Sequence, residues 1–385
     1  MNIFMVSSYF YPDGGGAESY AYNIAKRLVD GGHSVTVLCS GQEKRKKEES
    51  IDGIRIIRLK PDFTISTAPI KIGLLFDMIN FVRNGDFDLI DINFHLPYYP
   101  DIAALVSKIC KIPSVLTYHN DIVKDGLLMS SVAQIYNYSM NHVALRSMNL
   151  LITPSPFCYN ESKFLKPFTN KLVWIPPGVD IEKYSVGKSF KIHEAYNISD
   201  SSKIILFVGQ ISKAHTHKGV DQLIKSFKIV LEEVEGAYLV LVGRGDMISE
   251  YKKMCEEFNI SDNVIFTGFV DETELIEYYK SSDVVVLPST TVQEGFGMVL
   301  IEGNACGKPV IGTKVGGIQY VIEDGANGLL VPPKNPEALA SAIIKLLNDE
   351  DLAEKMGANG RRLVEEKYTW ERVAEMTEKV YEDLI

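Results

Sequence analysis

The sequence predicts an α/β protein with two doubly wound domains, each a mostly parallel sheet with helices on both faces. Short runs rich in β-branched residues alternate along the chain with amphipathic stretches of helix length. These runs are continuously apolar, which is typical of parallel strands covered on both faces. The length of 385 residues matches two domains of ordinary size, and 46% hydrophobic residues supply two cores.

In the first half of the chain, residues 20–30 are predicted as a helix between the first two strands. The predicted strands are residues 3–7, 34–39, 89–92 and 114–118. The apolar N-terminus lacks the basic flank of a signal peptide and soon reaches Pro12-Asp13-Gly14, so it is predicted as the first strand.

The same alternation starts again after a break at Ile175-Pro176-Pro177-Gly178, which we predict to be the hinge between the domains. The strands beyond it are residues 204–208, 238–242, 264–267 and 284–287, and the helices are 222–233, 247–258 and 336–347. From Tyr368 onward the chain predicts one more amphipathic helix. The predicted domains are residues 1–175 and 176–367.

Charge and composition exclude several classes of function. A net charge of −10 argues against a nucleic-acid-binding protein, which needs a surplus of lysine and arginine on its contact face. The five cysteines are widely scattered, so we expect neither a zinc site nor a disulfide framework, and a cytoplasmic location. No stretch reaches about 18 uninterrupted apolar residues, so any membrane contact is expected to be peripheral.

Ligands of open parallel sheets collect at the carboxyl ends of the strands, so the loops that follow strands are the candidate sites. After the first strand, Gly14-Gly15-Gly16 leads into a helix, where closely approaching backbone N–H groups favour an anion. A simple tight turn explains the same glycines. Their spacing is not the dinucleotide fingerprint, and no acidic residue closes the second strand at Cys39-Ser40-Gly41.

His119 and Lys218 also follow predicted strands. A histidine at this position can donate a hydrogen bond to a hydroxyl or phosphate, although a purely structural histidine fits too. Lys218 stands beside Gly219 near a helix start, where its ammonium can hold a phosphate as a point charge. His215 and His217 lie nearby, but no third ligand is near them in sequence, so we expect no metal site.

Glu294 and Glu302 form the most informative pair. Glu294 lies in a glycine-rich turn after a strand, and Glu302 follows in a predicted helix that begins at Met298. Eight helical residues span about 12 Å, which matches the separation of sugar and ribose in a folded sugar nucleotide. Carboxylates accept hydrogen bonds from vicinal hydroxyls, while N–H groups at the helix start face a diphosphate. The donor site then also includes Phe296, Gly297, Met298 and Val299.

Taken in order, these motifs resemble those of the retaining glycosyltransferases of family 4, part of glycosyl transferases group 1. The resemblance covers nearly the whole chain. It rests on Gly14-Gly15-Gly16-Ala17-Glu18, His119, Ile175-Pro176-Pro177-Gly178-Val179-Asp180, Lys218-Gly219, Glu294-x7-Glu302, Gly316-Gly317-Ile318 and Asp324-Gly325-Ala326-Asn327-Gly328. It implies the GT-B fold, with two facing Rossmann-like domains, a cleft between them, and a last helix, 368–385, that crosses back to the first domain.

The resemblance also implies roles for individual residues. Glu302 would bind the ribose hydroxyls, Glu294 the transferred sugar and Lys218 the diphosphate. His119 would contact the sugar from the N-terminal domain, and the loop with Gly15 and Gly16 would close over the donor. The implied catalytic residues are His119, Lys218 and Glu294.

The chain departs from the family pattern near the diphosphate. Many members place an arginine beside the lysine, whereas Gln210 stands there, and a few extra residues precede Lys218. We expect Lys213 to supply the missing charge, so Gln210 and Lys213 join the donor site. Pro177 replaces the usual asparagine of the hinge, and Tyr320 lies where a glutamate often follows the glycine pair. These changes affect the donor's identity more than the chemistry.

The implied activity is transfer of a sugar, with retention and without a metal or other cofactor, from a UDP- or GDP-linked donor. The acceptor would be a glycan or a lipid-linked molecule bound by the N-terminal domain, as in polysaccharide or glycolipid biosynthesis. In that domain, the apolar segment 63–83 and Lys44-Arg45-Lys46-Lys47 would meet the inner face of a membrane. A buried helix and a solvated loop explain the same residues.

Three alternatives remain open. A nicotinamide dehydrogenase also has doubly wound domains, but it needs the fingerprint that this chain lacks. A sugar-nucleotide epimerase or a phosphorylase of GT-B architecture would release free sugar or use inorganic phosphate. A non-catalytic partner subunit would bind glycans without transferring them, and we would expect it to have lost Glu294, Glu302 or Lys218, which are all present.

Overall fold

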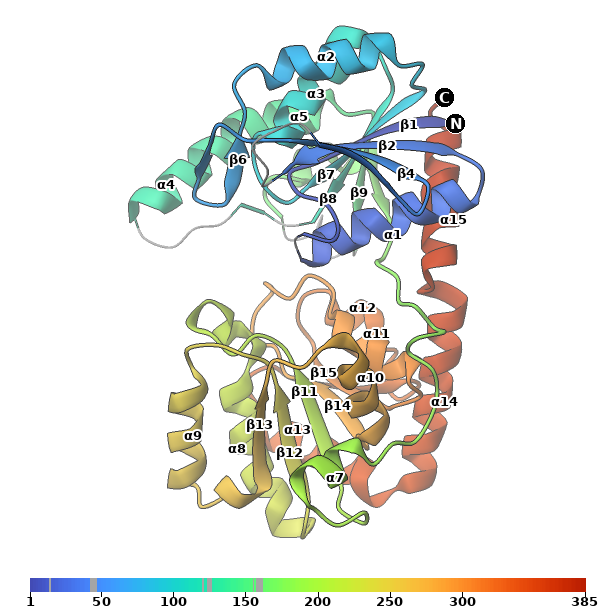
Figure 1. Ribbon diagram of the computed structural model, residues 1–385. Helices are drawn as coiled ribbons and strands as arrows, with labels where there is room; N and C mark the ends of the chain where they lie inside the picture. The colour runs from blue at the N-terminus through green and yellow to red at the C-terminus, as the bar shows by residue number, and fades with distance from the viewer. Residues whose placement is uncertain (14, 42–46, 120, 123–126, 155, 157–161) are drawn as a thin grey trace. The chain divides into compact units, whose positions relative to one another are not determined.

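The computed structural model describes residues 1–13, 15–41, 47–119, 121–122, 127–154, 156 and 162–385. The chain forms two compact units (Figure 1). Unit 1 is Met1–Gly178 together with Trp370–Ile385, and unit 2 is Val179–Thr369. The chain therefore changes unit two or three residues later than the sequence analysis expects at each crossing. The predicted cleft between the domains stays a prediction.

Unit 1 contains an eight-stranded sheet in the order β10-β9-β8-β7-β1-β2-β4-β3, in which β3 and β4 pair antiparallel and the other neighbours are parallel. The strands are β1 (Asn2–Ser7), β2 (Ser34–Ser40), β3 (Lys47–Ile51), β4 (Ile54–Leu59), β7 (Leu89–Phe94), β8 (Ser114–Tyr118), β9 (Leu150–Thr153) and β10 (Leu172–Trp174). The four strands predicted in this half are confirmed, because their continuous apolar runs are buried on both faces.

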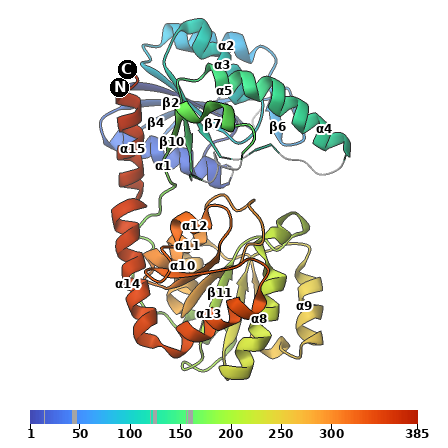
Figure 2. The same cartoon turned by 180° about the vertical axis from the view of Figure 1, so that it is seen from behind.

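Helices cover both faces of this sheet and enclose two apolar cores. One core lies under α2 (Leu74–Asn84), α3 (Tyr99–Cys110) and α5 (His142–Ser147), and the other under α1 (Gly16–Asp30) and α15 (Trp370–Glu382) (Figures 1 and 2). Ion pairs join α1 and its following turn to α15, with Arg27 Nε 3.3 Å from Glu371 and His33 Nε2 2.6 Å from Glu378. The predicted C-terminal helix thus packs on the first strand-helix unit. The remaining elements are α4 (Leu127–Tyr136), the π-helix η1 (Asn137–Asn141) and the 3-10 helix η2 (Lys166–Lys171).

The segment 63–83, proposed above as a membrane-facing stretch or a buried helix, is a hairpin followed by a helix. The hairpin is β5 (Phe63–Ile65) paired with β6 (Ala68–Ile70), and α2 follows. The helix buries Leu74, Met78 and Val82, whereas Phe76 is 72% exposed. In the described part of the chain, no helix is both long and apolar enough to cross a membrane. Residues 44–46 of the basic stretch lie outside the described residues.

Unit 2 contains a six-stranded parallel sheet in the order β13-β12-β11-β14-β15-β16. The strands are β11 (Ile204–Val208), β12 (Tyr238–Val242), β13 (Val264–Gly268), β14 (Val284–Leu287), β15 (Val310–Thr313) and β16 (Gly328–Val331). The helices are α7 (Lys191–Tyr196), η3 (Lys213–Lys218), α8 (Val220–Glu233), α9 (Ile248–Glu257), η4 (Ser261–Asn263), α10 (Glu272–Ser281), α11 (Met298–Ala305), α12 (Ile318–Val321), α13 (Pro336–Asn348) and α14 (Glu350–Lys367).

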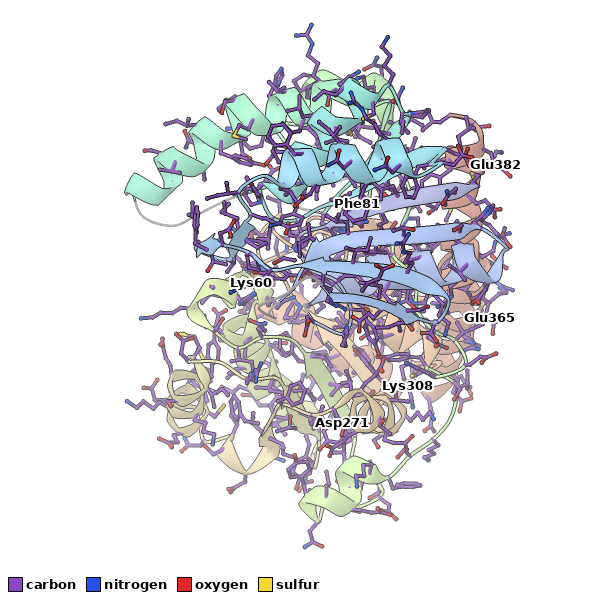
Figure 3. All side chains as sticks on the ribbon, turned by 45° about the horizontal axis from the view of Figure 1, so that its top comes forward. Lys60, Phe81, Asp271, Lys308, Glu365 and Glu382 are labelled. Carbon is purple, nitrogen blue, oxygen red and sulfur yellow. The ribbon has the colours of Figure 1, made fainter. Side chains whose placement is uncertain are left out.

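The sequence signals of unit 2 correspond to these elements. All four predicted strands and all three predicted helices are confirmed, with every end within two residues of its predicted place. Local capping explains some of the boundaries: Asp271 caps α10 by accepting a hydrogen bond from the Glu274 N–H at 2.9 Å (Figure 3). A single apolar core lies on the two faces of the sheet. The strand order is that of a doubly wound dinucleotide-binding fold.

Candidate functional site

In unit 2 the strand order reverses between β11 and β14, so the loops after these two strands diverge to opposite faces of the sheet. Such a switch point opens a crevice at the carboxyl ends of the strands, where doubly wound folds bind their ligands. The loop after β11 spans residues 209–219 and the loop after β14 spans residues 288–297. Most of the predicted donor-site residues lie on these two loops, so one strand order brings them together.

An ion pair between Lys218 and Glu294 joins the two loops across the switch point. Lys218 Nζ lies 2.9 Å from Glu294 Oε2, and the two side chains are only 19% and 12% exposed. Ser289 Oγ donates to the same carboxylate oxygen at 3.3 Å. A cation suited to phosphate and a carboxylate suited to sugar hydroxyls therefore stand side by side. The sequence analysis selected both residues without predicting that they touch.

Glycines allow the two loops to approach each other. Gly219 has φ of +73°, and a Cβ there would lie 2.1 Å from the Pro288 carbonyl oxygen. The Gly317 N–H donates to the Glu294 carbonyl at 2.9 Å, and a Cβ on Gly317 would lie 2.0 Å from the Gly295 oxygen. The glycine pair quoted for the family resemblance thus holds the backbone that carries Glu294.

The helix α11 begins at this site. Gly297, with φ of +94°, is its N-cap, so the first N–H groups of the helix, at Met298 and Val299, point out of its N-terminus. The partial positive charge of the eight-residue helix is located there and favours an anion. Phe296 differs from its neighbours, because its ring is 6% exposed and packs edge-on against Tyr368 at 5.8 Å. The Phe296 side chain is a core group, and its backbone is the part near the site.

Glu302 lies one helical turn into α11 and is held by a residue that sequence reasoning missed. The Tyr279 hydroxyl donates to Glu302 Oε2 at 2.6 Å, and the ring of Tyr184 packs 6.0 Å from that of Tyr279. Burial raises the pKa of Glu302, and the Tyr279 hydrogen bond opposes that shift. The assumption of eight helical residues behind the 12 Å estimate is wrong, because Glu294 precedes the N-cap and only the segment from Met298 onward is helical.

The remaining predicted donor residues lie on the β11 loop. Gln210 and Lys213 are exposed, and the Lys213 N–H donates to Asp246 at 2.9 Å as η3 begins. His215 and His217 precede Lys218 in η3, and burial together with the Lys218 charge lowers the pKa of both imidazoles. Within the described ranges, no group of three or more metal-ligating side chains comes together.

Unit 1 has its own switch point, between β1 and β7. Glu18 stands in the first turn of α1, which follows β1, and His95 directly follows β7. His95 Nε2 lies 2.6 Å from Glu18 Oε1, with exposures of 12% and 8%. Although burial alone would raise it, the His95 contact and the Gly15 N–H lower the pKa of Glu18 to about 2. His95 was not predicted; its position directly after an apolar strand, like that of His119, was the available signal.

The glycine-rich loop donates a hydrogen bond to the Glu18 carboxylate. Gly15 is the N-cap of α1, and its N–H donates to Glu18 Oε2 at 2.7 Å. A Cβ on Gly16 would meet open space, so Gly16 is not required there by packing. Gly14 lies outside the described residues. One of the N–H groups expected to face an anion is therefore already used by the protein.

His119 follows β8, the strand next to β7, and is half-buried, with its Nε2 atom buried. The ring of His119 packs edge-on against Tyr20 at 5.2 Å. The backbone N–H of His119 donates to the Phe94 carbonyl at 3.1 Å. Burial, with a smaller contribution from His95, lowers the pKa of the imidazole to about 3. Within the described residues its Nε2 has no hydrogen-bond partner. His119 is therefore a neutral imidazole with one nitrogen available to a ligand.

Two Rossmann-like units, each with a doubly wound sheet, define the architecture of the protein as the GT-B fold. The solved structure of Anabaena Alr3699/HepE with UDP has a TM-score of 0.79 to this chain, covers 100% of both chains and shares 20% identity. A further structure of that protein, with UDP-glucose, has a TM-score of 0.77 at the same identity and coverage. The predicted fold class is confirmed.

The chain belongs to glycosyltransferase family 4. The family model described as Glycosyltransferase Family 4 matches residues 14–183, and the model described as Glycosyl transferases group 1 matches residues 188–363. The chain is 30% identical over 377 residues to an uncharacterized glycosyltransferase, MJ1607, of Methanocaldococcus jannaschii, covering 95% of this chain and 94% of that one. It is 27% identical over 392 positions to O-antigen chain mannosyltransferase C of Escherichia coli, covering 100% and 99%. The predicted family is confirmed.

Proposed function

We propose that this glycosyltransferase moves a hexosyl group from a UDP- or GDP-linked sugar to a hydroxyl of a glycan or lipid-linked acceptor. The observation that carries the proposal is the Lys218–Glu294 pair at the switch point of unit 2, 2.9 Å apart and next to the start of α11. A diphosphate needs a cation and N–H donors, and a sugar needs a carboxylate acceptor. Both requirements meet at this point, and one of the relatives is described as a mannosyltransferase.

The proposed chemistry is cleavage of the anomeric C–O bond, with both electrons leaving on the diphosphate oxygen. The acceptor hydroxyl oxygen forms the new C–O bond at the anomeric carbon, and its proton goes to the departing diphosphate. Lys218 and the first N–H groups of α11 stabilise the charge that develops there. Because these groups supply positive charge themselves, we assign the reaction no metal and no other cofactor. Retention of configuration is proposed on family membership, and we assign no covalent nucleophile. Glu294 orients the sugar hydroxyls, and Glu302 the ribose.

On the side of unit 1, the proposal assigns sugar and acceptor contacts to His119 and His95. His119 is neutral, because burial lowers the pKa of its imidazole to about 3. A neutral imidazole forms a hydrogen bond with a sugar hydroxyl without adding charge to the site. His95 is oriented by Glu18, as a histidine that must present one fixed nitrogen usually is.

We further propose that the protein is cytoplasmic and contacts the inner face of a membrane through unit 1. Phe63, Ile72 and Phe76 are 49%, 73% and 72% exposed in the hairpin and helix region predicted for that contact. Single exposed apolar residues are common, but several of them within one short segment favour an interface with lipid.

The first test is thermal stability of the wild type and of Glu302→Ala with UDP, GDP, ADP and NAD. A ligand at 100 times its dissociation constant should raise the free energy of unfolding by about 2.7 kcal/mol. We expect one of UDP and GDP to stabilise the wild type and to stabilise the variant less. Stabilisation by NAD alone would contradict the proposal and favour a dehydrogenase.

Product analysis separates the remaining alternatives. With the matching sugar nucleotide, transfer to an acceptor hydroxyl is expected. Free sugar or a sugar phosphate as the main product would identify an epimerase or a phosphorylase instead. Binding of the nucleotide without any turnover would favour a non-catalytic subunit.

A further inference from the structure

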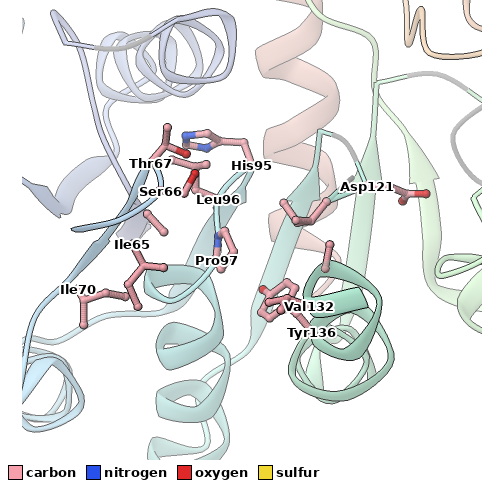
Figure 4. Close-up of a pocket in the computed structure, with 13 residues that line it drawn as sticks. Ile65, Ser66, Thr67, Ile70, His95, Leu96, Pro97, Asp121, Val132 and Tyr136 are labelled. Carbon is pink, nitrogen blue, oxygen red and sulfur yellow. The ribbon is translucent and has the colours of Figure 1, made fainter. Parts of the chain in front are cut away.

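Unit 1 contains a cavity of about 320 Å³ that is lined partly by the segment 63–83 and by none of the predicted catalytic or donor-site residues (Figure 4). It lies between the β5–β6 hairpin, the loop after β7 and helix α4. Its apolar lining comes from Ile65, Ala68, Ile70, Leu96, Pro97, Ile122, Val132 and Ala133. The volume is at the lower end of the range for small-molecule sites.

The polar residues around the cavity direct their polar atoms elsewhere. The Tyr136 hydroxyl donates to Asp101 at 2.9 Å. The Asp121 carboxylate accepts hydrogen bonds from Tyr118 and Ser162, both at 2.7 Å, and points away from the cavity in Figure 4. Ser66 and Thr67, also in the lining, form the exposed hairpin turn. The inner wall is therefore hydrocarbon.

The lining combines one buried polar group with exposed apolar side chains. His95 belongs to the lining, and its Nδ1 is buried with no hydrogen-bond partner in the described part of the chain, while its Nε2 lies 2.6 Å from Glu18 Oε1. Ile65 and Val132 also belong to the lining and are 59% and 51% exposed. A polar group and exposed apolar side chains in one lining match an amphiphilic molecule.

We propose that the cavity binds the hydrocarbon chain of an amphiphilic acceptor, whose hydroxyl head lies at His95 and whose chain leaves over Val132. This inference rests on the proposed function, since it names the class of acceptor. A free glycan would leave its hydroxyl groups unpaired against this wall, which is costly in free energy. A hydrocarbon chain gains from the same burial. Of the two acceptor classes in the proposed function, the glycan and the lipid-linked molecule, this inference assigns the lipid-linked one to this protein.

The test uses alkyl β-glucosides with butyl, hexyl and octyl chains, all below their micelle-forming concentrations, titrated into the full-length protein by calorimetry. The sugar head is constant, so the comparison isolates the chain. Full burial of one methylene strengthens binding about fourfold. From butyl to octyl we expect a gain of at least tenfold, because part of the chain stays exposed where it leaves over Val132. Equal affinity for all three chains would overturn the proposal.

Matched variants locate the binding site of the hydrocarbon chain. Ala133→Trp fills the cavity from α4, where Ala133 is 6% exposed, and should abolish the dependence on chain length. Ile135→Trp adds the same ring to the same helix outside the cavity, where Ile135 is 68% exposed, and should preserve the dependence on chain length. If both variants lose the dependence on chain length equally, or if Ala133→Trp keeps it, the cavity is not the binding site and adsorption to the outer surface is favoured.

Two controls keep the outcome interpretable. If Ala133→Trp fails to fold, the smaller filling Ala68→Leu on β6 replaces it, because Ala68 is also buried in the lining. Stabilisation by UDP or GDP is measured in the same samples. Loss of chain-length dependence with an intact nucleotide response contradicts the acceptor class alone, whereas no nucleotide response in the wild type contradicts the proposed function.

Discussion

The two units place an acid–base pair at the same topological position and surround it differently. In unit 2, Lys218 and Glu294 meet between β11 and β14, and in unit 1, His95 and Glu18 meet between β7 and β1. The first pair is surrounded by glycines and the start of α11, and the second by the half-buried His119 and an apolar cavity. One scaffold thus offers a site for a charged group twice, and the flanking loops decide which ligand suits it.

The pairs also differ in what holds their carboxylates. Glu18 accepts from the backbone N–H of Gly15 at its own helix cap, in addition to contacting His95. Glu294 is held by the side chains of Lys218 and Ser289 from other loops. A carboxylate tied to its own helix is a positioning group, whereas one tied to a lysine can exchange that partner for a ligand. We therefore expect Lys218 to act on the donor and Glu18 to act through His95.

The largest expected effect is on catalysis at the unit 2 pair. Lys218→Ala removes the charge that stabilises the leaving diphosphate, and kcat/KM should fall about 10²- to 10³-fold. The same assay on His95→Asn should raise the KM for the acceptor and leave donor affinity unchanged. If kcat/KM falls less than tenfold in Lys218→Ala, or if His95→Asn lowers donor affinity as much as Lys218→Ala does, the two pairs do not divide the substrates as proposed.

A second prediction concerns the pH dependence of stability in unit 1. The pKa of His119 is about 3 in the folded protein and 6.5 without its surroundings. Between these values the unfolded chain binds a proton that the folded chain does not, so stability falls as the pH falls. The slope is about 1.4 kcal/mol per pH unit. Urea unfolding of the wild type and His119→Gln at pH 7, 6 and 5 should therefore give curves that converge toward low pH.

Glu18 provides a control in a different pH window. Its folded pKa of about 2 lies below the ordinary 4.5, so its contribution is complete above that ordinary value and is lost as the pH falls toward 2. Glu18→Gln should leave the slope between pH 7 and about pH 5.5 unchanged. Parallel unfolding profiles for the wild type and His119→Gln over this range would show that His119 is not buried as a neutral group.

A third prediction concerns the support of Glu302. Tyr279→Phe removes the hydroxyl that donates to this half-buried carboxylate, and the free energy of unfolding should fall by about 1–3 kcal/mol. Affinity for the nucleotide should fall as well, because Glu302 loses the group that orients it. Tyr278→Phe is the matched control, since its hydroxyl lies 3.4 Å from Tyr196 instead. Equal nucleotide affinity in the two variants would argue against a role for Glu302 in donor binding.

The smallest expected effect belongs to Lys213. Its side chain is exposed, and exposed charge pairs contribute about 1 kcal/mol or less. Lys213→Ala should weaken donor binding no more than about fivefold at low salt, and less as the salt concentration rises. Nucleotide titrations at two ionic strengths measure this. Unchanged affinity at low salt would remove Lys213 from the donor site and leave Lys218 as the side-chain cation of the β11 loop that acts there.

The sequence by itself determined the elements, the family and most of the unit 2 site. Strands such as β11 and β14 are recognisable because a strand buried on both faces must be apolar throughout. Post-strand loops then identify Lys218, Glu294 and His119 without knowledge of the fold. These signals are local, since each depends on a few neighbouring residues, and local signals survive in a sequence read alone.

Only the tertiary structure decided which of these residues meet. His95 and Glu18 are far apart in the chain, and their contact follows from β7 and β1 being neighbours, which depends on how the whole sheet packs. The support of Glu302 by Tyr279 and the apolar cavity beside His95 have the same origin. Strand order and cavity shape result from many weak contacts among distant residues, so no short pattern in the sequence encodes them.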